Sequence, residues 1–168
     1  MSSKAADGRA AIFAGLEREI RKLSAQSVLF SQAVSGRLGI NSSDLECLDI
    51  VVLGGAATAG QLAAATGLTT GAITGVIDRL EKAGYVRRRR DPQDRRRVIV
   101  EPTPGVERRI VPLFASLADT MTRLWSTYAD SDLTLIREFV AKSYPLMVEE
   151  TAKLRDAPPP RRRLNRVE

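Results

Sequence analysis

The chain of 168 residues contains no histidine and a single cysteine. The lack of histidine removes the usual general base of enzymes and the usual zinc ligand. One cysteine excludes an intramolecular disulfide and a cysteine-based metal site, and it fits a reducing compartment. Aromatic residues make up only 5% of the chain, which argues against a stacking surface for single-stranded nucleic acid.

Long hydrophobic runs are missing as well. The longest stretch without a charged residue, 50–77, is rich in glycine, alanine and threonine and is too polar to span a membrane. No apolar segment follows the polar residues 1–8, so a signal peptide is not expected. We therefore expect a soluble, cytoplasmic protein without a membrane partner, with residues 1–8 flexible.

The composition that remains is that of one globular domain with a basic surface. Lysine and arginine number 26 against 20 aspartate and glutamate residues, which gives a formal net charge of +6 and an isoelectric point near 10.0. Such an excess favours a polyanionic partner, either nucleic acid or an acidic membrane surface.

Hydrophobic periodicity and capping signals predict a mainly helical chain. The predicted helices cover residues 9–38, 44–54, 59–66, 70–83, 104–129 and 132–155. The residues expected at helix starts are Ser43 with Glu46, Thr58 with Gln61, Thr69, Thr103, and Asp130 or Ser131. Pro112 falls inside the fifth predicted helix, where a kink is expected, and Pro145 falls inside the last one, which it would bend or end early.

A β-hairpin is expected between the fourth and fifth helices, with strands at residues 85–88 and 98–101 and a turn around Pro92. Residues 87–97 contain seven arginines and two aspartates, a local charge of +5. A charge run is usually a solvated surface. Solvation alone does not require that all seven cations be arginine, so we interpret this hairpin as a binding element.

Residues 61–76 have the spacing of a helix-turn-helix. Ala63 is small where two helices would cross, and Gly67 lies at the turn, where a positive φ is often needed. The core between the helices would be closed by Leu62, Leu68, Ile73 and Val76. A plain αα-hairpin has the same pattern, but the arginine-rich hairpin that follows favours a winged helix that binds duplex nucleic acid.

Three stretches resemble the MarR family of winged-helix regulators, namely residues 67–69 (GLT), 76–86 (VIDRLEKAGYV) and 91–96 (DPQDRR). The helix order around them is similar too, so the resemblance covers about residues 10–155. It implies one domain at residues 9–156 that consists of a winged helix-turn-helix at about 42–102 and dimerisation helices at about 9–38 and 104–155. For the flanking helices, a single intramolecular bundle is the alternative.

The resemblance implies a homodimer on double-stranded DNA, with a recognition helix of each subunit in a major groove and a wing over a minor groove. A two-fold dimer would read a pseudo-palindromic operator whose half-sites lie about one turn (~34 Å) apart. The candidate DNA-binding residues are Thr69, Thr70, Gly71, Thr74, Gly75, Arg79, Arg90, Asp94, Arg95, Arg96 and Arg97.

Several of these residues have a second interpretation. Arg79 would contact phosphate, or it would pair with an acidic neighbour on its own helix. Asp94 would fix the wing through an ion pair with a neighbouring arginine, or it would serve as a simple turn residue. The wing-tip arginine of the family falls on Arg96. Many family members carry a polar side chain at position 71 and an arginine at position 75, where this chain has glycine.

Two glycines in the recognition helix suggest a hypothesis about base readout. Each costs about 1 kcal/mol of helix stability relative to alanine. The bare face would let the helix approach DNA closely while reading few bases, so that specificity depends on Thr74, on the wing and on DNA shape. Alternatively, Gly71 and Gly75 lie beside a phosphate strand and are merely tolerated.

Members of the family often release DNA when a small molecule binds, and others respond to cysteine oxidation. The sequence identifies no ligand pocket. Cys47 has no cationic neighbour in sequence to stabilise a thiolate, so we expect a buried, unreactive thiol rather than a sensor. Residues 157–168 hold three prolines and four arginines and are expected to form a disordered basic tail.

The predicted function is therefore a sequence-specific DNA-binding transcriptional regulator without cofactor or metal. The resemblance favours a repressor that a small-molecule effector releases. An enzyme is the first alternative, but no catalytic, phosphate-binding or metal motif supports it. The second alternative is a winged helix that serves as a protein-interaction module without specific DNA binding.

Overall fold

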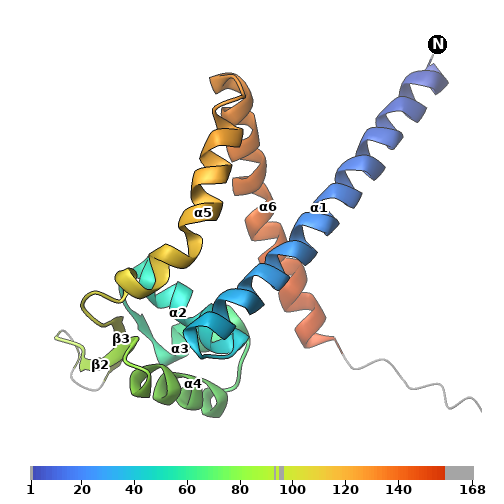
Figure 1. Cartoon of the computed structure of the whole chain (residues 1–168). Helices are drawn as coiled ribbons and strands as arrows, with labels where there is room; N and C mark the ends of the chain where they lie inside the picture. Colours follow the sequence, from blue (N-terminus) through green and yellow to red (C-terminus); the bar gives the residue numbers. More distant parts are fainter. Residues whose placement is uncertain (1, 93, 95–96, 158–168) are drawn as a thin grey trace, which may run out of the picture. The chain divides into compact units, whose positions relative to one another are not determined.

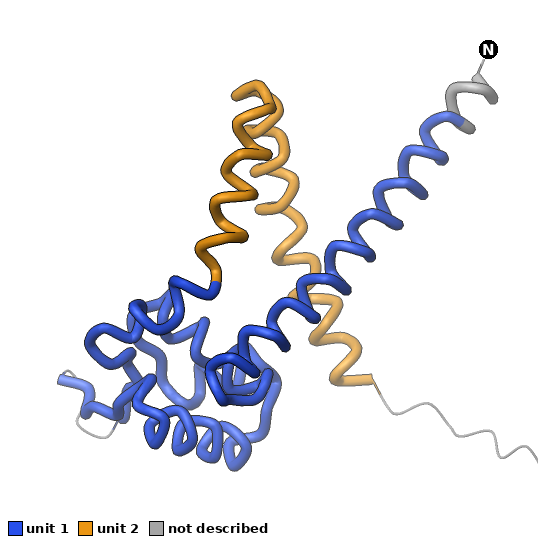
Figure 2. Tube along the Cα trace, viewed as in Figure 1, with its two compact units in different colours: residues 1–113 blue, residues 114–168 orange. Residues whose placement is uncertain are grey.

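The computed structural model describes residues 2–92, 94 and 97–157, and it confirms the predicted fold class (Figure 1). The helices are α1 (Ser2–Leu38), α2 (Ser42–Gly54), α3 (Ala59–Thr66), α4 (Thr70–Lys82), α5 (Glu107–Trp125) and α6 (Asp130–Asp156). The strands are β1 (Ala57–Thr58), β2 (Val86–Arg90) and β3 (Val98–Pro102). The chain divides into two compact units, residues 1–113 and 114–168, and α5 contributes to both (Figure 2).

A small antiparallel sheet in the first unit has the strand order β1-β3-β2. β2 and β3 form the predicted hairpin, with Val86 opposite Pro102 and Arg90 opposite Val98. β2 runs to Arg90, so the prediction that it ends at residue 88 was wrong. β1 was not predicted, because two residues are too few to show an alternating pattern.

One hydrophobic core holds the first unit together. α4 contributes an apolar stripe at the expected helical spacing, and each of its members is at most 2% exposed. The stripe consists of Ile73, Val76, Ile77 and Leu80, and it faces a core that includes Leu45, Leu48, Val51, Leu62, Val86 and Val100. Burying each of the larger aliphatic side chains contributes about 2 kcal/mol before entropy is counted. The recognition-helix candidate α4 is therefore anchored by its inner face.

Local hydrogen bonds explain where the central helices begin. Thr58 and Gln61 form the predicted capping box of α3, and Thr69 caps α4 by accepting a hydrogen bond from the N–H of Ala72 at 3.3 Å. The capping box predicted for Ser43 and Glu46 was wrong. Asn41 is the N-cap of α2, because its Oδ1 accepts a 2.8 Å hydrogen bond from the N–H of Asp44.

The long helices differ from prediction mainly at their ends. α1 begins at Ser2 rather than at residue 9, so residues 2–8 are helical. Thr103 is not an N-cap, because its hydroxyl donates to the carbonyl of Gly84 at 2.8 Å and α5 begins only at Glu107. α5 ends at residue 125 instead of 129, and α6 begins at Asp130 without a side-chain cap.

Both internal prolines lie within their helices, and α6 continues through Pro145 to residue 156. The predicted tail, after residue 157, lies outside the described residues. Within the described part of the chain, no helix combines the length and hydropathy needed to cross a bilayer.

Candidate nucleic-acid interface

The helix-turn-helix is made by α3 and α4. Gly67 ends α3 at a φ of +70°, a conformation that favours glycine, and its N–H donates to the carbonyl of Ala63 at 2.7 Å. The helices meet over Leu62 and Ile73, both fully buried. The predicted turn residue and the predicted core positions Leu62, Ile73 and Val76 are therefore confirmed, whereas Leu68 is only half-buried.

The outer face of α4 carries the predicted base-facing positions. Thr70, Gly71 and Thr74 are exposed, and a Cβ at Gly71 would meet no atom within 4 Å. The hydroxyl of Thr74 donates to the carbonyl of Thr70 at 3.0 Å, so its proton is used within the helix. At Gly75 a Cβ would lie 3.4 Å from Nη1 of Arg79. The face is therefore bare at Gly71, whereas the side chain of Arg79 lies over Gly75, so the bare face that the sequence suggests is found only in part. Contact of this face with DNA stays a prediction.

Arg79 is paired with Asp44 at the start of α2. Its Nε lies 3.2 Å and 3.0 Å from the two carboxylate oxygens, and its Nη2 lies 2.6 Å from Oδ1. These hydrogen bonds to Asp44 raise the pKa of Arg79 further above its ordinary value. The alternative prediction, a pair within α4, was therefore wrong. The pair joins two helices instead, and phosphate contact by Arg79 stays a prediction.

Glu101 on β3 organises one side of the wing. Its carboxylate accepts hydrogen bonds from Nε of Arg87 and Nε of Arg89, both at 2.8 Å. These arginines are two residues apart on β2, so their side chains lie on the same face of the sheet. The hydrogen bond from Arg89 is the main cause that lowers the pKa of Glu101, which has its side chain only 13% exposed. Glu101 thus stays ionised and fixes two arginines.

Arg88 joins the wing to α4. Its Nη2 lies 2.5 Å from Oδ1 of Asp78, and its Nη1 donates to the carboxylate of Glu81. The backbone N–H of Arg88 donates to Glu81 as well, at 3.1 Å. Because both acidic residues lie on α4, the wing and the helix are linked by side chains that are not among the predicted DNA-binding residues.

In the described part of the wing, some arginines are therefore already paired with carboxylates, and others are free to contact a partner. Arg87, Arg88 and Arg89 are matched by carboxylates outside residues 87–97, so the +5 counted from that stretch overstates the free charge. Among the described residues, Arg90 and Arg97 are exposed and have no acidic partner. Arg95 and Arg96, including the family's wing-tip position, lie outside the described residues.

Asp94 takes part in the turn between the wing strands. Its carbonyl accepts a hydrogen bond from the N–H of Arg97 at 2.9 Å, and the N–H of Asp91 donates to the carbonyl of Arg97 at 3.0 Å. These backbone bonds support the turn role of Asp94. Its ion pair with a neighbouring arginine stays a prediction.

A second cluster at the end of α4 was missed by the sequence reasoning. Arg109 donates to the carbonyl of Ala83 at 3.0 Å and stacks over the ring of Tyr85, 3.9 Å from its centroid. The hydroxyl of Tyr85 donates to the carbonyl of Leu38 at 2.7 Å. The cluster connects the ends of α1 and α4 with the start of α5. No local sequence signal could have found it, because its members are far apart in the chain.

Replacing Tyr85 by phenylalanine should lower the free energy of unfolding by about 1 kcal/mol, because the carbonyl of Leu38 loses its donor while the buried ring is retained. Urea denaturation at fixed protein concentration measures this loss. Tyr128→Phe is the matched control, since Tyr128 is 45% exposed. Equal stability of the two variants would show that the Tyr85 hydroxyl contributes nothing.

Cys47 is fully buried, as predicted. The pKa of its thiol is raised from 9.0 to about 11, mainly because the thiol is buried. The carboxylates of Glu46 and Asp44 contribute to this rise, since they disfavour a second negative charge nearby, and Arg79 opposes it. A thiol with such a raised pKa is a poor nucleophile at neutral pH. The structure therefore favours the unreactive thiol over the redox sensor.

Alkylation of Cys47 by iodoacetamide at pH 8 should be at least about 100-fold slower in the folded protein than in urea, since the thiolate fraction falls about 100-fold between pKa values of 9.0 and 11. The folded rate should rise with pH up to about 11. Mass spectrometry of quenched samples measures both rates. Comparable rates in the two states would mean that the thiol is accessible and reactive.

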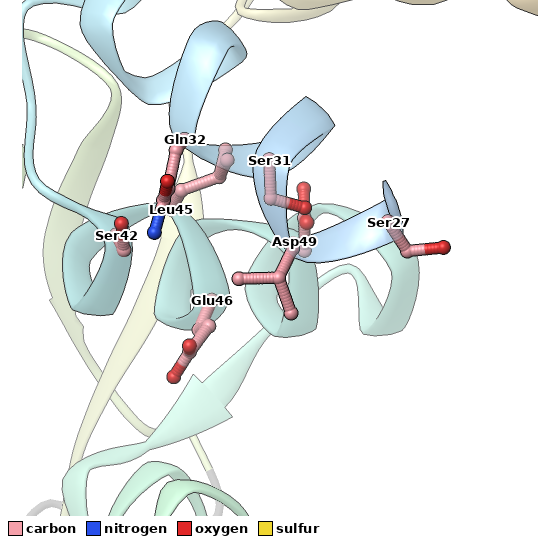
Figure 3. Close-up of a pocket in the computed structure, with 8 residues that line it drawn as sticks. Ser27, Ser31, Gln32, Ser42, Leu45, Glu46 and Asp49 are labelled. Carbon is pink, nitrogen blue, oxygen red and sulfur yellow. The ribbon is translucent and has the colours of Figure 1, made fainter. Parts of the chain in front are cut away.

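A cavity of about 230 Å³ lies between α1 and α2 (Figure 3). It is lined by Ser27, Val28, Ser31, Gln32, Ser42, Leu45, Glu46 and Asp49. Burial raises the pKa of Asp49. The lining holds two carboxyl groups and no cation, which gives the cavity an acidic character. Among the described residues, no cluster of three or more potential ligands could hold a metal ion.

Comparison with known proteins identifies the family. The family model described as MarR matches residues 40–98. The uncharacterized HTH-type transcriptional regulator YcgE of Bacillus subtilis is 44% identical over 135 residues, which cover 80% of this chain and 88% of that protein.

Solved structures show the same fold. A MarR family protein from Bacillus stearothermophilus has 20% identity and a TM-score of 0.64, with 82% of this chain and 96% of that chain covered. A mutant of MarR from E. coli, complexed with operator DNA, has 21% identity and a TM-score of 0.53, with 77% and 93% covered. From the winged helix, the motifs and the relative from Bacillus subtilis, it follows that this chain belongs to the MarR family of transcriptional regulators.

Proposed function

We propose that the chain binds specific sequences of double-stranded DNA as a homodimer and represses transcription. α4 would enter the major groove, and the wing would lie over the adjacent minor groove. The observation that carries this proposal is the link through Arg88, which fixes the wing strand beside α4 while Arg90 and Arg97 remain exposed without acidic partners among the described residues. Such a regulator would work in the cytoplasm.

Exposed apolar side chains support the homodimer. In the first unit, α1 exposes Ile12, Phe13, Leu16, Ile20 and Leu23. In the second unit, the described part of α6 has no buried residue and exposes Leu135, Phe139, Tyr144, Leu146 and Met147, among others. Monomeric proteins rarely leave extended apolar helix faces in water, and each of these two helices exposes one. A second copy of the chain is the partner that a two-fold regulator requires.

Selection of bound sequences from random duplexes tests the proposed DNA binding. We expect a pseudo-palindromic consensus and a light-scattering mass of two chains. Affinity for the selected duplex should fall steeply with salt, since binding would neutralise about 6–10 phosphates and release their counterions. Recovery of no consensus, together with a flat salt response, would favour the protein-interaction module instead.

The cavity between α1 and α2 is the site that we propose for a small-molecule effector. Its serines and Gln32 offer hydrogen bonds, and Glu46 and Asp49 disfavour an anionic ligand. A neutral or cationic aromatic molecule would suit it better than a benzoate. Such compounds should raise the melting temperature in a thermal-shift assay and release DNA in a binding assay, whereas benzoates should do neither. Asp49→Asn should weaken the discrimination against anionic compounds, which Glu46 would then maintain alone, with Glu138→Gln on α6 as the matched control.

A further inference from the structure

The guanidinium of Arg79 covers Gly75 on the outer side of α4. Nη1 of Arg79 would lie 3.4 Å from a Cβ at Gly75. The two residues are one helical turn apart, and helical side chains lean toward the N-terminus of their helix, so Arg79 reaches back over position 75. A long side chain at position 75 would compete for this space. The glycine thus leaves room for the guanidinium.

Asp44 holds that guanidinium in place. Nε and Nη2 of Arg79 donate to the carboxylate, whose side chain is only 2% exposed, while the arginine side chain is 51% exposed. Nη1 forms no hydrogen bond with any residue that the structure describes. Planar, two-point pairing of arginine with a carboxylate fixes direction as well as distance. The free Nη1 edge is therefore presented in one orientation, and little side-chain entropy remains to be lost when it binds.

We propose that Arg79 is a specificity-determining residue of the DNA interface, that Asp44 is its positioning residue, and that Gly75 provides the space in which it lies. This inference depends on the proposed DNA-binding function. The exposed Nη1 would stand in for a side chain at position 75 and donate to an acceptor on a base edge in the major groove. Guanine presents two such acceptors, O6 and N7, which makes it the expected base. Asp44 itself is buried and would not touch DNA.

Two conservative variants separate this role from a merely structural ion pair. Arg79→Lys keeps the charge but loses the planar fork, and Asp44→Asn keeps the shape but loses the anion. Both are examined by sequence selection and by titration with the selected and a scrambled duplex, after circular dichroism confirms the fold. We expect the base preference to relax at one position of each half-site. The affinity for the selected duplex should fall about 10-fold. Affinity for the scrambled duplex should stay within about twofold. Lys142→Gln, an exposed charge change on α6, is the matched control.

Position 75 offers an independent test. Gly75→Ala adds a Cβ at ordinary contact distance, so site preference should persist and the melting temperature should rise. Gly75→Arg should displace the guanidinium of Arg79 and change the preferred base. The inference is overturned if Arg79→Lys and Gly75→Arg, both folded, select the wild-type consensus with unchanged discrimination. Failure of the wild-type protein to select any consensus would instead reject the proposed function. Should Asp44→Asn not fold, the other variants decide the question.

Discussion

Replacement of Arg79 by alanine is expected to lower the free energy of unfolding by about 3 kcal/mol. The carboxylate of Asp44 would remain in a nearly closed environment, with its side chain 2% exposed, and would lose the three short contacts that Arg79 provides. The remaining contact, from the N–H of Asn41 at 3.5 Å, is long for a hydrogen bond and cannot compensate. Equilibrium urea denaturation at pH 7.5 and a fixed chain concentration measures the change.

Removing both partners should be less harmful than removing Arg79 alone, because no unpaired charge is then left behind. Together with the two single variants, Arg79→Ala and Asp44→Ala, the double variant Asp44→Ala/Arg79→Ala forms a double-mutant cycle. We expect its coupling free energy to be about 1–3 kcal/mol. Arg90→Ala is the matched control, since Arg90 is exposed without an acidic partner among the described residues, and its effect should stay within about 0.5 kcal/mol. If Arg79→Ala costs no more than this control, the pair contributes nothing to stability.

Local sequence signals predict the helix-turn-helix well. Thr58, Gln61, Gly67 and Thr69 act within a few residues of their own positions, and the structure confirms each of them. The start of α2 was misplaced because two overlapping capping patterns lie side by side. Asn41 with Asp44 and Ser43 with Glu46 have the same spacing, and the structure uses the first of them.

The interactions that organise the interface could not be predicted locally. Asp44 and Arg79 are 35 positions apart, and their contact depends on how α2 crosses α4. Glu101 faces Arg87 only because the two strands pair in one particular register. The same limit explains why counting charges within residues 87–97 overstated the free charge of the wing. Its neutralising carboxylates come from β3 and α4.

The wing therefore contains two classes of arginine, and they should behave differently toward DNA. Replacing Arg90 and Arg97 together by glutamine should weaken binding about 100-fold or more at 0.1 M salt. If each contacts one phosphate per protomer, the dimer loses four contacts, and the slope of log affinity against log salt should fall by about 3.6. Replacing Arg87 and Arg89 by glutamine removes as many cations, but both are already paired with Glu101, whose single negative charge offsets one of the two. That control variant should lose less affinity, and its slope of log affinity against log salt should stay within about 1 of the wild-type slope. Fluorescence anisotropy from 50 to 300 mM salt measures both, and equal slopes for the two double variants would contradict the division of the wing into paired and available arginines.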